Sequence, residues 1–131
     1  MSFQCTVVTP EQQVLDEQVT QAIVPAHDGQ VGILTDRAPL LVKLGVGELR
    51  LDLAGGQRRA FLIDGGVAQM KDNRLTILTD DAVPAAEINA EEARAAAAEA
   101  SAQRITDAES FQQRQHRLAR ARAMQQMASS R

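Results

Sequence analysis

The chain has 131 residues, a formal net charge of −3 and 44% hydrophobic residues, which is typical of one globular domain with at most a small appendage. Its acidic balance and its aromatic content of 2% offer neither a surface for polyanions nor stacking platforms, so no nucleic-acid partner is expected. The single cysteine, Cys5, excludes an internal disulfide framework and fits a reducing compartment.

The residue types change near Pro84. All 8 glycines and all 4 prolines lie within the first 84 residues, together with most of the β-branched residues. Alanine and charged helix formers dominate residues 85–131. Strands and turns are therefore expected in residues 1–84, and helices in residues 85–131.

The first 84 residues have the pattern of short strands joined by tight turns. Leucines alternate with polar residues over 49–53, and 54–57 and 71–74 have the composition of hairpin turns. Pro25 is expected to end a strand, and Gly65-Gly66 to mark a bend or a close backbone approach. The expected strands are 3–9, 18–24, 31–34, 38–43, 48–52, 60–63, 67–70 and 75–79. This many short strands predicts a β-sandwich or a barrel.

A first helix is expected to begin after Asn89, whose side chain can cap it. Glu92, three residues later, can reach back to the backbone N–H of Asn89. Alanines recur at helical spacing and form a thin stripe of small side chains: Ala90, Ala93, Ala97 and Ala100. The stripe buries little area, but it lets a second helix approach closely.

A second helix is expected to begin at Thr106, with Glu109 three residues later, the same spacing as between Asn89 and Glu92. Its larger apolar residues fall along one side: Phe111, Leu118 and Met124. The simplest arrangement is an antiparallel hairpin that turns near 105–106, and a single long bent helix is the alternative. Because alanine contacts add little hydrophobic free energy, we expect the hairpin to detach from the β-domain without unfolding it.

No set of residues points to catalysis or to a metal site. The two histidines, His27 and His116, lie in different halves of the chain, and His27 belongs to a turn expected to be solvated. No serine follows a strand as in a nucleophile elbow, no phosphate-binding loop is present, and Cys5 sits in an apolar strand. Neither a secretory signal nor a membrane-spanning apolar run is visible. The expected protein is not an enzyme.

Charge is unevenly divided between the two helices. Residues 87–110 hold six acidic residues, whereas residues 111–131 hold no acid and five arginines, namely Arg114, Arg117, Arg120, Arg122 and Arg131. These arginines either complement the acidic first helix in solvent, or they form a basic surface for an acidic partner. The sequence leaves both interpretations open.

The β-half contains an ordered series of motifs that resembles a known family. Its segments are 24–34 (VPAHDGQVGIL), 38–41 (APLL), 47–49 (GEL), 65–67 (GGV) and 75–82 (LTILTDDA). In this order they resemble the bacterial epsilon subunit of the F-type ATP synthase, over essentially the whole chain. The resemblance implies a ten-stranded β-sandwich in residues 1–84 and an antiparallel helical hairpin in residues 85–131.

The resemblance also implies a function and a location. Members of this family are non-catalytic subunits of the central stalk that help couple transmembrane proton flow to ATP synthesis. Their partners are the gamma subunit, the ring of c subunits, and the alpha and beta subunits of the catalytic head. The implied location is the cytoplasmic face of the bacterial inner membrane, reached only through the complex. A mobile hairpin can inhibit ATP hydrolysis in such proteins.

Three groups of residues carry specific roles in this resemblance. The polar loops that would meet the c ring contain Asp28, Gln30, Asp36 and Arg37. The arginines that would meet the catalytic head are Arg114, Arg117, Arg120 and Arg122. No cofactor is implied, but ATP is a possible regulatory ligand, with Glu91, Arg94 and Arg122 as its candidate contacts. The alternative function is a stand-alone β-sandwich adaptor that senses nucleotide through its hairpin.

Overall fold

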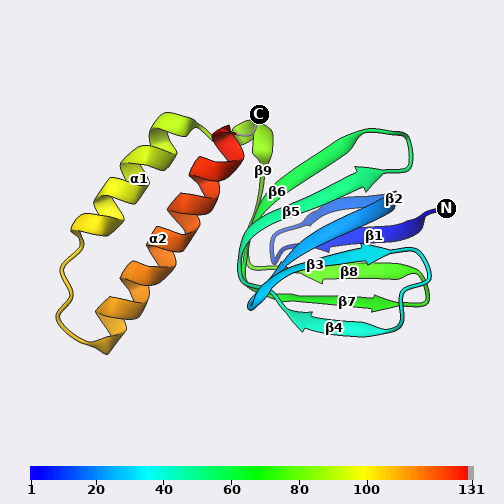
Figure 1. Ribbon diagram of the computed structural model, residues 1–131, viewed down its shortest axis with the longest axis horizontal. Coiled ribbons are helices and arrows are strands. Elements are labelled where there is room, and N and C mark those ends of the chain that lie inside the picture. Colours follow the sequence, from blue (N-terminus) through cyan, green and yellow to red (C-terminus); the bar gives the residue numbers. More distant parts are fainter. Residues whose placement is uncertain (130–131) are drawn as a thin grey trace.

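The computed structural model describes residues 1–129 and contains a β-sandwich with a helical hairpin at its side. In Figure 1 the strands gather in one body and the two helices stand beside it, joined through β9 and a short 3-10 turn, η1 (Ala85–Glu87). The predicted class of a mainly β protein with a C-terminal antiparallel hairpin is confirmed. Arg131, one of the five C-terminal arginines, lies outside the described residues.

The described residues form nine strands rather than the ten that the resemblance implied. The strands are β1 (Phe3–Val8), β2 (Gln13–Ala26), β3 (Gly29–Leu34), β4 (Leu40–Lys43), β5 (Val46–Leu53), β6 (Arg58–Asp64), β7 (Val67–Lys71), β8 (Arg74–Leu78) and β9 (Ala82–Pro84). The three-residue β9 was not among the expected strands, since it is too short to show an alternating pattern and forms by pairing with β6.

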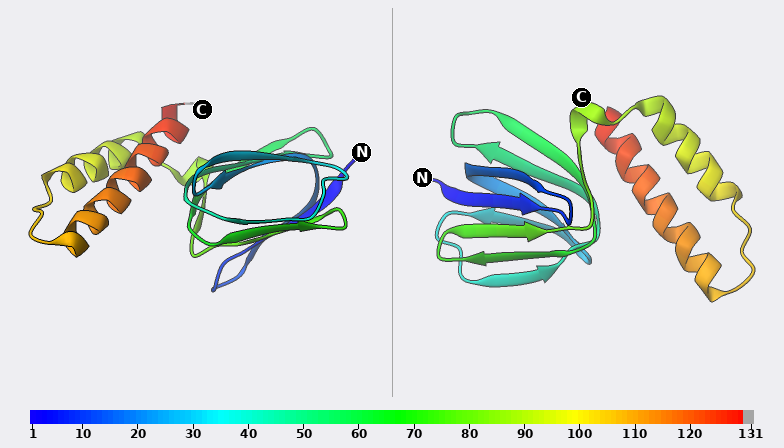
Figure 2. Two further views of the ribbon diagram at one scale, coloured as in Figure 1. Left: turned by 60° about the horizontal axis from the view of Figure 1, so that its bottom comes forward. Right: turned by 180° about the vertical axis from the view of Figure 1, so that it is seen from behind.

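The strands make one continuous sheet that curls back on itself. Its order is β4-β7-β8-β1-β2-β5-β6-β9, and β3 pairs with β2 beside this path. All pairings are antiparallel except β1 with β8. Seen from the side, the two halves of the sheet face each other across the core (Figure 2).

Pro25 does not end a strand, contrary to the expectation from sequence. β2 runs through Pro25 to Ala26, where residues 27–28 make the turn into β3. The carbonyl of Pro25 accepts a hydrogen bond of 2.8 Å from the backbone N–H of Gly45. The Pro25 ring also packs against Gly47, because a Cβ at that glycine would lie only 2.8 Å from the Pro25 Cβ. Tertiary packing thus holds a proline inside a strand.

The main core fills the space between the two halves of the sheet. It includes Phe3, Leu51 and Phe61, all almost fully buried. Cys5 belongs to it, as predicted, and burial together with the charge of Asp16 raises the pKa of Cys5 to about 12. A second, smaller cluster lies where the hairpin meets the sandwich, and its buried members are Leu62, Ile88 and Met127.

Gly65-Gly66 forms a tight bend, as expected from the sequence. Both residues have positive φ angles, 76° and 108°. A Cβ on Gly66 would lie 2.0 Å from the carbonyl oxygen of Leu78, so no side chain fits there. The bend therefore needs glycine both for its backbone angles and for its space.

The hairpin consists of α1 (Ala90–Ala102) and α2 (Ala108–Ser129), which pack against each other. Both the predicted turn and the Asn89 cap are confirmed, and the alternative of one long helix is wrong. The Asn89 side chain accepts hydrogen bonds from the N–H groups of Glu91 and Glu92 at 2.7 and 3.2 Å.

The start of α2 and its apolar face differ from expectation. Asp107, not Thr106, caps the helix, since its Oδ1 accepts from the N–H of Ser110 at 2.8 Å and the Ser110 Oγ accepts from the N–H of Asp107 at 3.0 Å. Phe111 remains 46% exposed, whereas Met127 is buried against the sandwich. Of the apolar residues expected on one side of α2, Leu118 is buried and Met124 packs against the second cluster, so Phe111 is the one that departs from the prediction. Contacts of α2 with β5 and β6 add Met127 to the covered side.

Candidate functional site

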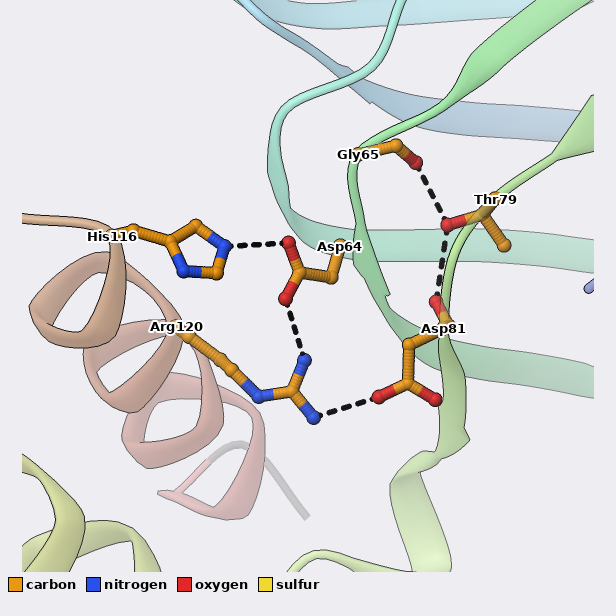
Figure 3. A network of polar contacts seen from close by, with 6 residues as sticks. All are labelled: Asp64, Gly65, Thr79, Asp81, His116 and Arg120. Carbon is orange, nitrogen blue, oxygen red and sulfur yellow. Dashed lines mark hydrogen bonds and ion pairs between the residues drawn. The ribbon is translucent and has the colours of Figure 1, made fainter. Parts of the chain in front are cut away.

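A single arginine connects α2 to the sandwich through two ion pairs. The Nη1 of Arg120 donates to Asp64 Oδ2 and its Nη2 donates to Asp81 Oδ2, both at 2.8 Å (Figure 3). Asp64 ends β6 and Asp81 directly precedes β9. One guanidinium group thus bridges two carboxylates from separate segments of the sandwich, using its two terminal nitrogens.

His116 adds a third contact to the same carboxylates. Its Nε2 lies 2.7 Å from Asp64 Oδ1, so each oxygen of Asp64 has its own partner on α2. His116 and Arg120 are four residues apart, which places them on the same side of the helix. We call Asp64, Asp81, His116 and Arg120 the hairpin clamp.

The sandwich holds the backbones of Asp64 and Asp81 next to each other without help from the hairpin. The N–H of Asp64 donates to the carbonyl of Asp81 at 3.3 Å, next to the pairing of β6 with β9. The Thr79 hydroxyl donates to the carbonyl of Gly65 at 2.8 Å and lies 3.1 Å from that of Asp81 (Figure 3). These bonds place Asp64 and Asp81 side by side, where Arg120 of α2 can bind both of them.

The electrostatics of the clamp favour a charged Arg120. Partial burial opposes the charge, but the hydrogen bonds that Arg120 donates to Asp81 and Asp64, together with their negative charges, outweigh it, and the pKa of Arg120 is raised. The Arg120 side chain is 30% exposed, and its partners Asp64 and Asp81 are 19% and 48% exposed, so solvent screens the pair with Asp81 more than the pair with Asp64. Allowing for that screening, the clamp contributes roughly 1–2 kcal/mol to docking of the hairpin.

A cavity of about 730 Å³ separates α2 from the sandwich beside the second apolar cluster. Three arginines line it, two from the sandwich (Arg50 and Arg58) and one from α2 (Arg122). Arg50 lies 3.7 Å from Glu48 and Arg58 bonds Asp52 at 2.9 Å. Gln30 and Gln126 add polar groups to its walls. Glu48 also belongs to the lining, so three arginines stand against one carboxylate there, and this balance favours an anionic ligand.

The fold and both helices match proteins of one family. The family described as ATP synthase, Delta/Epsilon chain, beta-sandwich domain matches residues 2–85. This chain belongs to the ATP synthase delta/epsilon family. An ATP synthase epsilon chain of Rhodopirellula baltica is 41% identical over 100 residues, covering 76% of this chain and 77% of that one. The epsilon chain of Desulfitobacterium hafniense is 32% identical over 130 residues, covering 99% of this chain and 97% of that one.

A solved structure extends the likeness to the hairpin. A chain in the Euglena gracilis mitochondrial ATP synthase, in a structure of OSCP, F1 and c-ring, superposes with a TM-score of 0.87 and 25% identity. The superposition covers 99% of this chain and 82% of that chain. The resemblance seen in the sequence is therefore confirmed for the whole length of this epsilon-family member. Among residues 1–129, no helix is long and apolar enough to span a membrane.

The four arginines expected to meet the catalytic head do not share one face of α2. Arg114 donates to the carbonyl of Ser101 at 3.2 Å, and Arg117 donates to Gln103 Oε1 at 3.2 Å. Both therefore fasten the end of α1, while Arg120 belongs to the clamp and Arg122 faces the cavity. In this folded arrangement, three of the four guanidinium groups are engaged within the chain.

The residues expected to bind nucleotide are not brought together. Arg94 pairs with Glu91 at 3.2 Å on the exposed surface of α1. Arg122 lines the cavity on the sandwich side of α2, and neither Glu91 nor Arg94 contributes to that lining. In the folded arrangement, Arg122 instead shares the cavity with Arg50 and Arg58 of the sandwich.

The residues expected to meet the c ring lie at the two ends of β3. Asp28 belongs to the exposed turn before β3 and Gln30 to its start, whereas Asp36 and Arg37 follow its end. Six residues of strand span about 20 Å. Among the described strands, β3 pairs with β2 alone. The other edge of β3 is therefore unpaired over its whole length, from Asp28 and Gln30 at one end to Asp36 and Arg37 at the other.

Sequence reasoning missed three members of the clamp: Asp64, Asp81 and His116. Asp81 lies inside the motif at residues 75–82 with no role of its own there, and His116 enters the sequence analysis only as a histidine without a metal-ligand partner. The one available signal was the spacing of His116 and Arg120 on one helical face. Nothing local marks the two aspartates, because their adjacency arises from strand pairing.

Proposed function

We propose that this chain is a non-catalytic subunit of the central stalk of an F-type ATP synthase. It binds the gamma subunit and the c ring and helps couple proton flow to ATP synthesis in the alpha and beta subunits. The observation that carries the proposal is the superposition of sandwich and hairpin together, over 99% of the chain, on a chain of an F1 and c-ring assembly. The proposed location is the cytoplasmic face of the bacterial inner membrane, peripheral to it.

Isolation of the complex tests this assignment. The full chain with an affinity tag, expressed in its own host, is purified from mildly solubilised membranes. The expected co-purifying proteins are the gamma subunit, the c ring and the catalytic head. Recovery of the chain alone from the soluble fraction, with none of these subunits, supports instead the stand-alone nucleotide-sensing adaptor.

The sandwich is proposed to dock on the c ring along the open edge of β3. This edge carries Asp28 and Gln30 at one end and Asp36 and Arg37 at the other, and these four side chains belong to exposed residues. A surface about 20 Å long is large enough to meet the polar loops of more than one neighbouring subunit. Substituting residues at both ends of the edge distinguishes a contact along it from a contact at one turn.

The hairpin is proposed to inhibit ATP hydrolysis after it leaves the sandwich. Arg114, Arg117, Arg120 and Arg122 then meet an acidic surface of the catalytic head. The support is that the hairpin is held, among the described residues, by one polar clamp and an apolar cluster in which three members are buried and seven are partly buried. Such a contact can open without disturbing the much larger main core.

ATP is proposed as a regulatory ligand because three arginines line a cavity of about 730 Å³ between α2 and the sandwich. Phosphate groups in that cavity would join Arg122 of the hairpin to Arg50 and Arg58 of the sandwich. Glu91 and Arg94 would take part only if α1 shifts, since they lie outside the lining. Calorimetry with millimolar ATP is the test, and an absence of heat rejects the ligand.

A further inference from the structure

Two loops that are distant in sequence are tied together at the end of the sandwich opposite the hairpin. The N–H of Asp36 donates to Asn73 Oδ1 at 2.7 Å, and Asn73 Nδ2 donates to Asp36 Oδ1 at 2.9 Å. These reciprocal bonds join the connection from β3 to β4 with the turn between β7 and β8 (Figure 1). Arg37 is the residue that directly follows the tied position.

Asn73 uses a third polar group as well. Its carbonyl accepts from the N–H of Gln4 at 3.1 Å, so one residue holds β1 and both loops. Asp72 and Asn73 have φ angles of 52° and 56°, the conformation of a two-residue hairpin turn, and Asp36 has a φ angle of 63°. Asp36 and Asn73 are exposed, so water could satisfy these groups. The bonds therefore add order to the loop more than stability to the fold.

Three cations stand on or next to the tied loops without an ion pair. Lys71 and Arg74 are paired directly across β7 and β8, an arrangement that like charges disfavour. Neither they nor Arg37 form an ion pair or side-chain hydrogen bond within residues 1–129. A partner surface with carboxylates or free carbonyl oxygens would relieve this repulsion.

We propose that the turn between β7 and β8 is a second part of the c-ring docking surface, in which Asn73 positions Arg37 and Lys71 and Arg74 add charge. This inference rests on the proposed c-ring contact of Arg37. The c ring is the chosen partner because its polar loops offer acceptors to three cations held on adjoining loops. Asn73 is a positioning residue, because its bonds reach Asp36 and not the partner.

The first test replaces Asn73 without changing the backbone. Asn73→Gly keeps the positive φ angle, which glycine adopts freely, and removes both side-chain bonds to Asp36. Asp72→Gly frees the backbone in the same way at the neighbouring turn residue and keeps both bonds, and because it removes a negative charge beside the cations it should not weaken binding. Full-length variants in complex with gamma are bound to purified c rings in detergent. We expect about three- to tenfold weaker binding for N73G and less than about twofold for D72G.

A double-mutant cycle then asks whether Asn73 acts through Arg37. In a chain that carries Arg37→Ala, N73G is expected to have little further effect on c-ring binding. An equal loss in both backgrounds overturns the positioning role. If R37A weakens binding and N73G does not, only this inference fails. If R37A itself has no effect, the proposed contact of Arg37 fails first, and the inference fails with it.

The salt dependence of binding tests the two added cations. Lys71→Gln with Arg74→Gln is expected to flatten the dependence of c-ring affinity on salt, since two charges leave the interface. Arg59→Gln, on the exposed start of β6, removes one positive charge away from the tied loops and should leave that dependence unchanged. A salt dependence that is unchanged in the double variant removes Lys71 and Arg74 from the surface.

Discussion

Asp64 and Asp81 stand next to each other because the N–H of Asp64 donates to the carbonyl of Asp81 at 3.3 Å. The bond belongs to the sandwich, so the two residues are neighbours through their backbones and not only through the hairpin. Without Arg120, the remaining contact from α2 is that of His116 with Asp64, and Asp81 loses its partner on the hairpin. The two aspartates of the sandwich therefore favour a cation at the facing position of α2. A single change of charge at either side should weaken the docking of α2.

Replacing Arg120 should release the hairpin and leave the sandwich folded. Arg120→Gln removes both 2.8 Å ion pairs, whereas Arg117→Gln removes one exposed hydrogen bond to Gln103. In hydrogen exchange, we expect amide protection in α2 to fall by about five- to thirtyfold in R120Q, with protection in the main core unchanged. R117Q is the control and should resemble the parent chain. Equal loss of protection in core and hairpin contradicts independent docking.

Replacing Asp64 should increase inhibition of ATP hydrolysis in the assembled complex. Asp64→Asn removes the charge that faces both His116 and Arg120. The hairpin should then leave the sandwich more often, and its arginines can bind the catalytic head. We expect hydrolysis to fall by about two- to threefold, while Asp80→Asn, at the exposed neighbour of Asp81, leaves it unchanged. A cysteine cross-link between α2 and β6 measures release in the same samples. Release without a fall in hydrolysis contradicts the inhibitory role, and no release contradicts the clamp.

Cys5 should make the free energy of unfolding depend on pH above about pH 9. Burial and Asp16 raise the pKa of Cys5 from 9.0 to about 12, so the folded chain keeps its proton longer than the unfolded chain does. Stability from this thiol is complete below pH 9 and is lost as pH rises toward 12, by at most about 1.4 kcal/mol per pH unit. Urea unfolding at about pH 8 and about pH 10.5 measures this loss. Cys5→Ala should lose less stability over that interval, and an identical loss contradicts the prediction.

Adding one methyl group at Gly66 should destabilise the sandwich strongly. In Gly66→Ala the new Cβ would lie 2.0 Å from the Leu78 carbonyl oxygen, at a φ angle of 108°. We expect a loss of about 2–4 kcal/mol in the free energy of unfolding, or failure to fold. Gly55→Ala is the control, because no heavy atom beyond its chain neighbours lies within 4 Å of its Cβ position, and it should change stability by less than about 0.5 kcal/mol. If G66A loses no more free energy of unfolding than G55A, the backbone near Leu78 can move away from the new methyl group at little cost, and the prediction is wrong.

Local chemistry in the sequence determined much of the architecture. Alternating leucines predicted β5, glycine pairs predicted the bend at residues 65–66, and Asn89 predicted the start of α1. Each of these features depends on a few consecutive residues, whose periodicity or backbone freedom is readable without the fold. The order of motifs from residue 24 to residue 82 also pointed to the family.

Only the tertiary structure decided which side chains meet. Arg120 was singled out from the sequence for its charge, but its partners lie 56 and 39 residues away, at the ends of strands that the sequence does not pair. The bond between Asp36 and Asn73 likewise crosses 37 residues. Pro25 continues a strand and Phe111 stays exposed for the same reason: neighbours from distant segments, rather than local preference, set the lowest free energy at those positions.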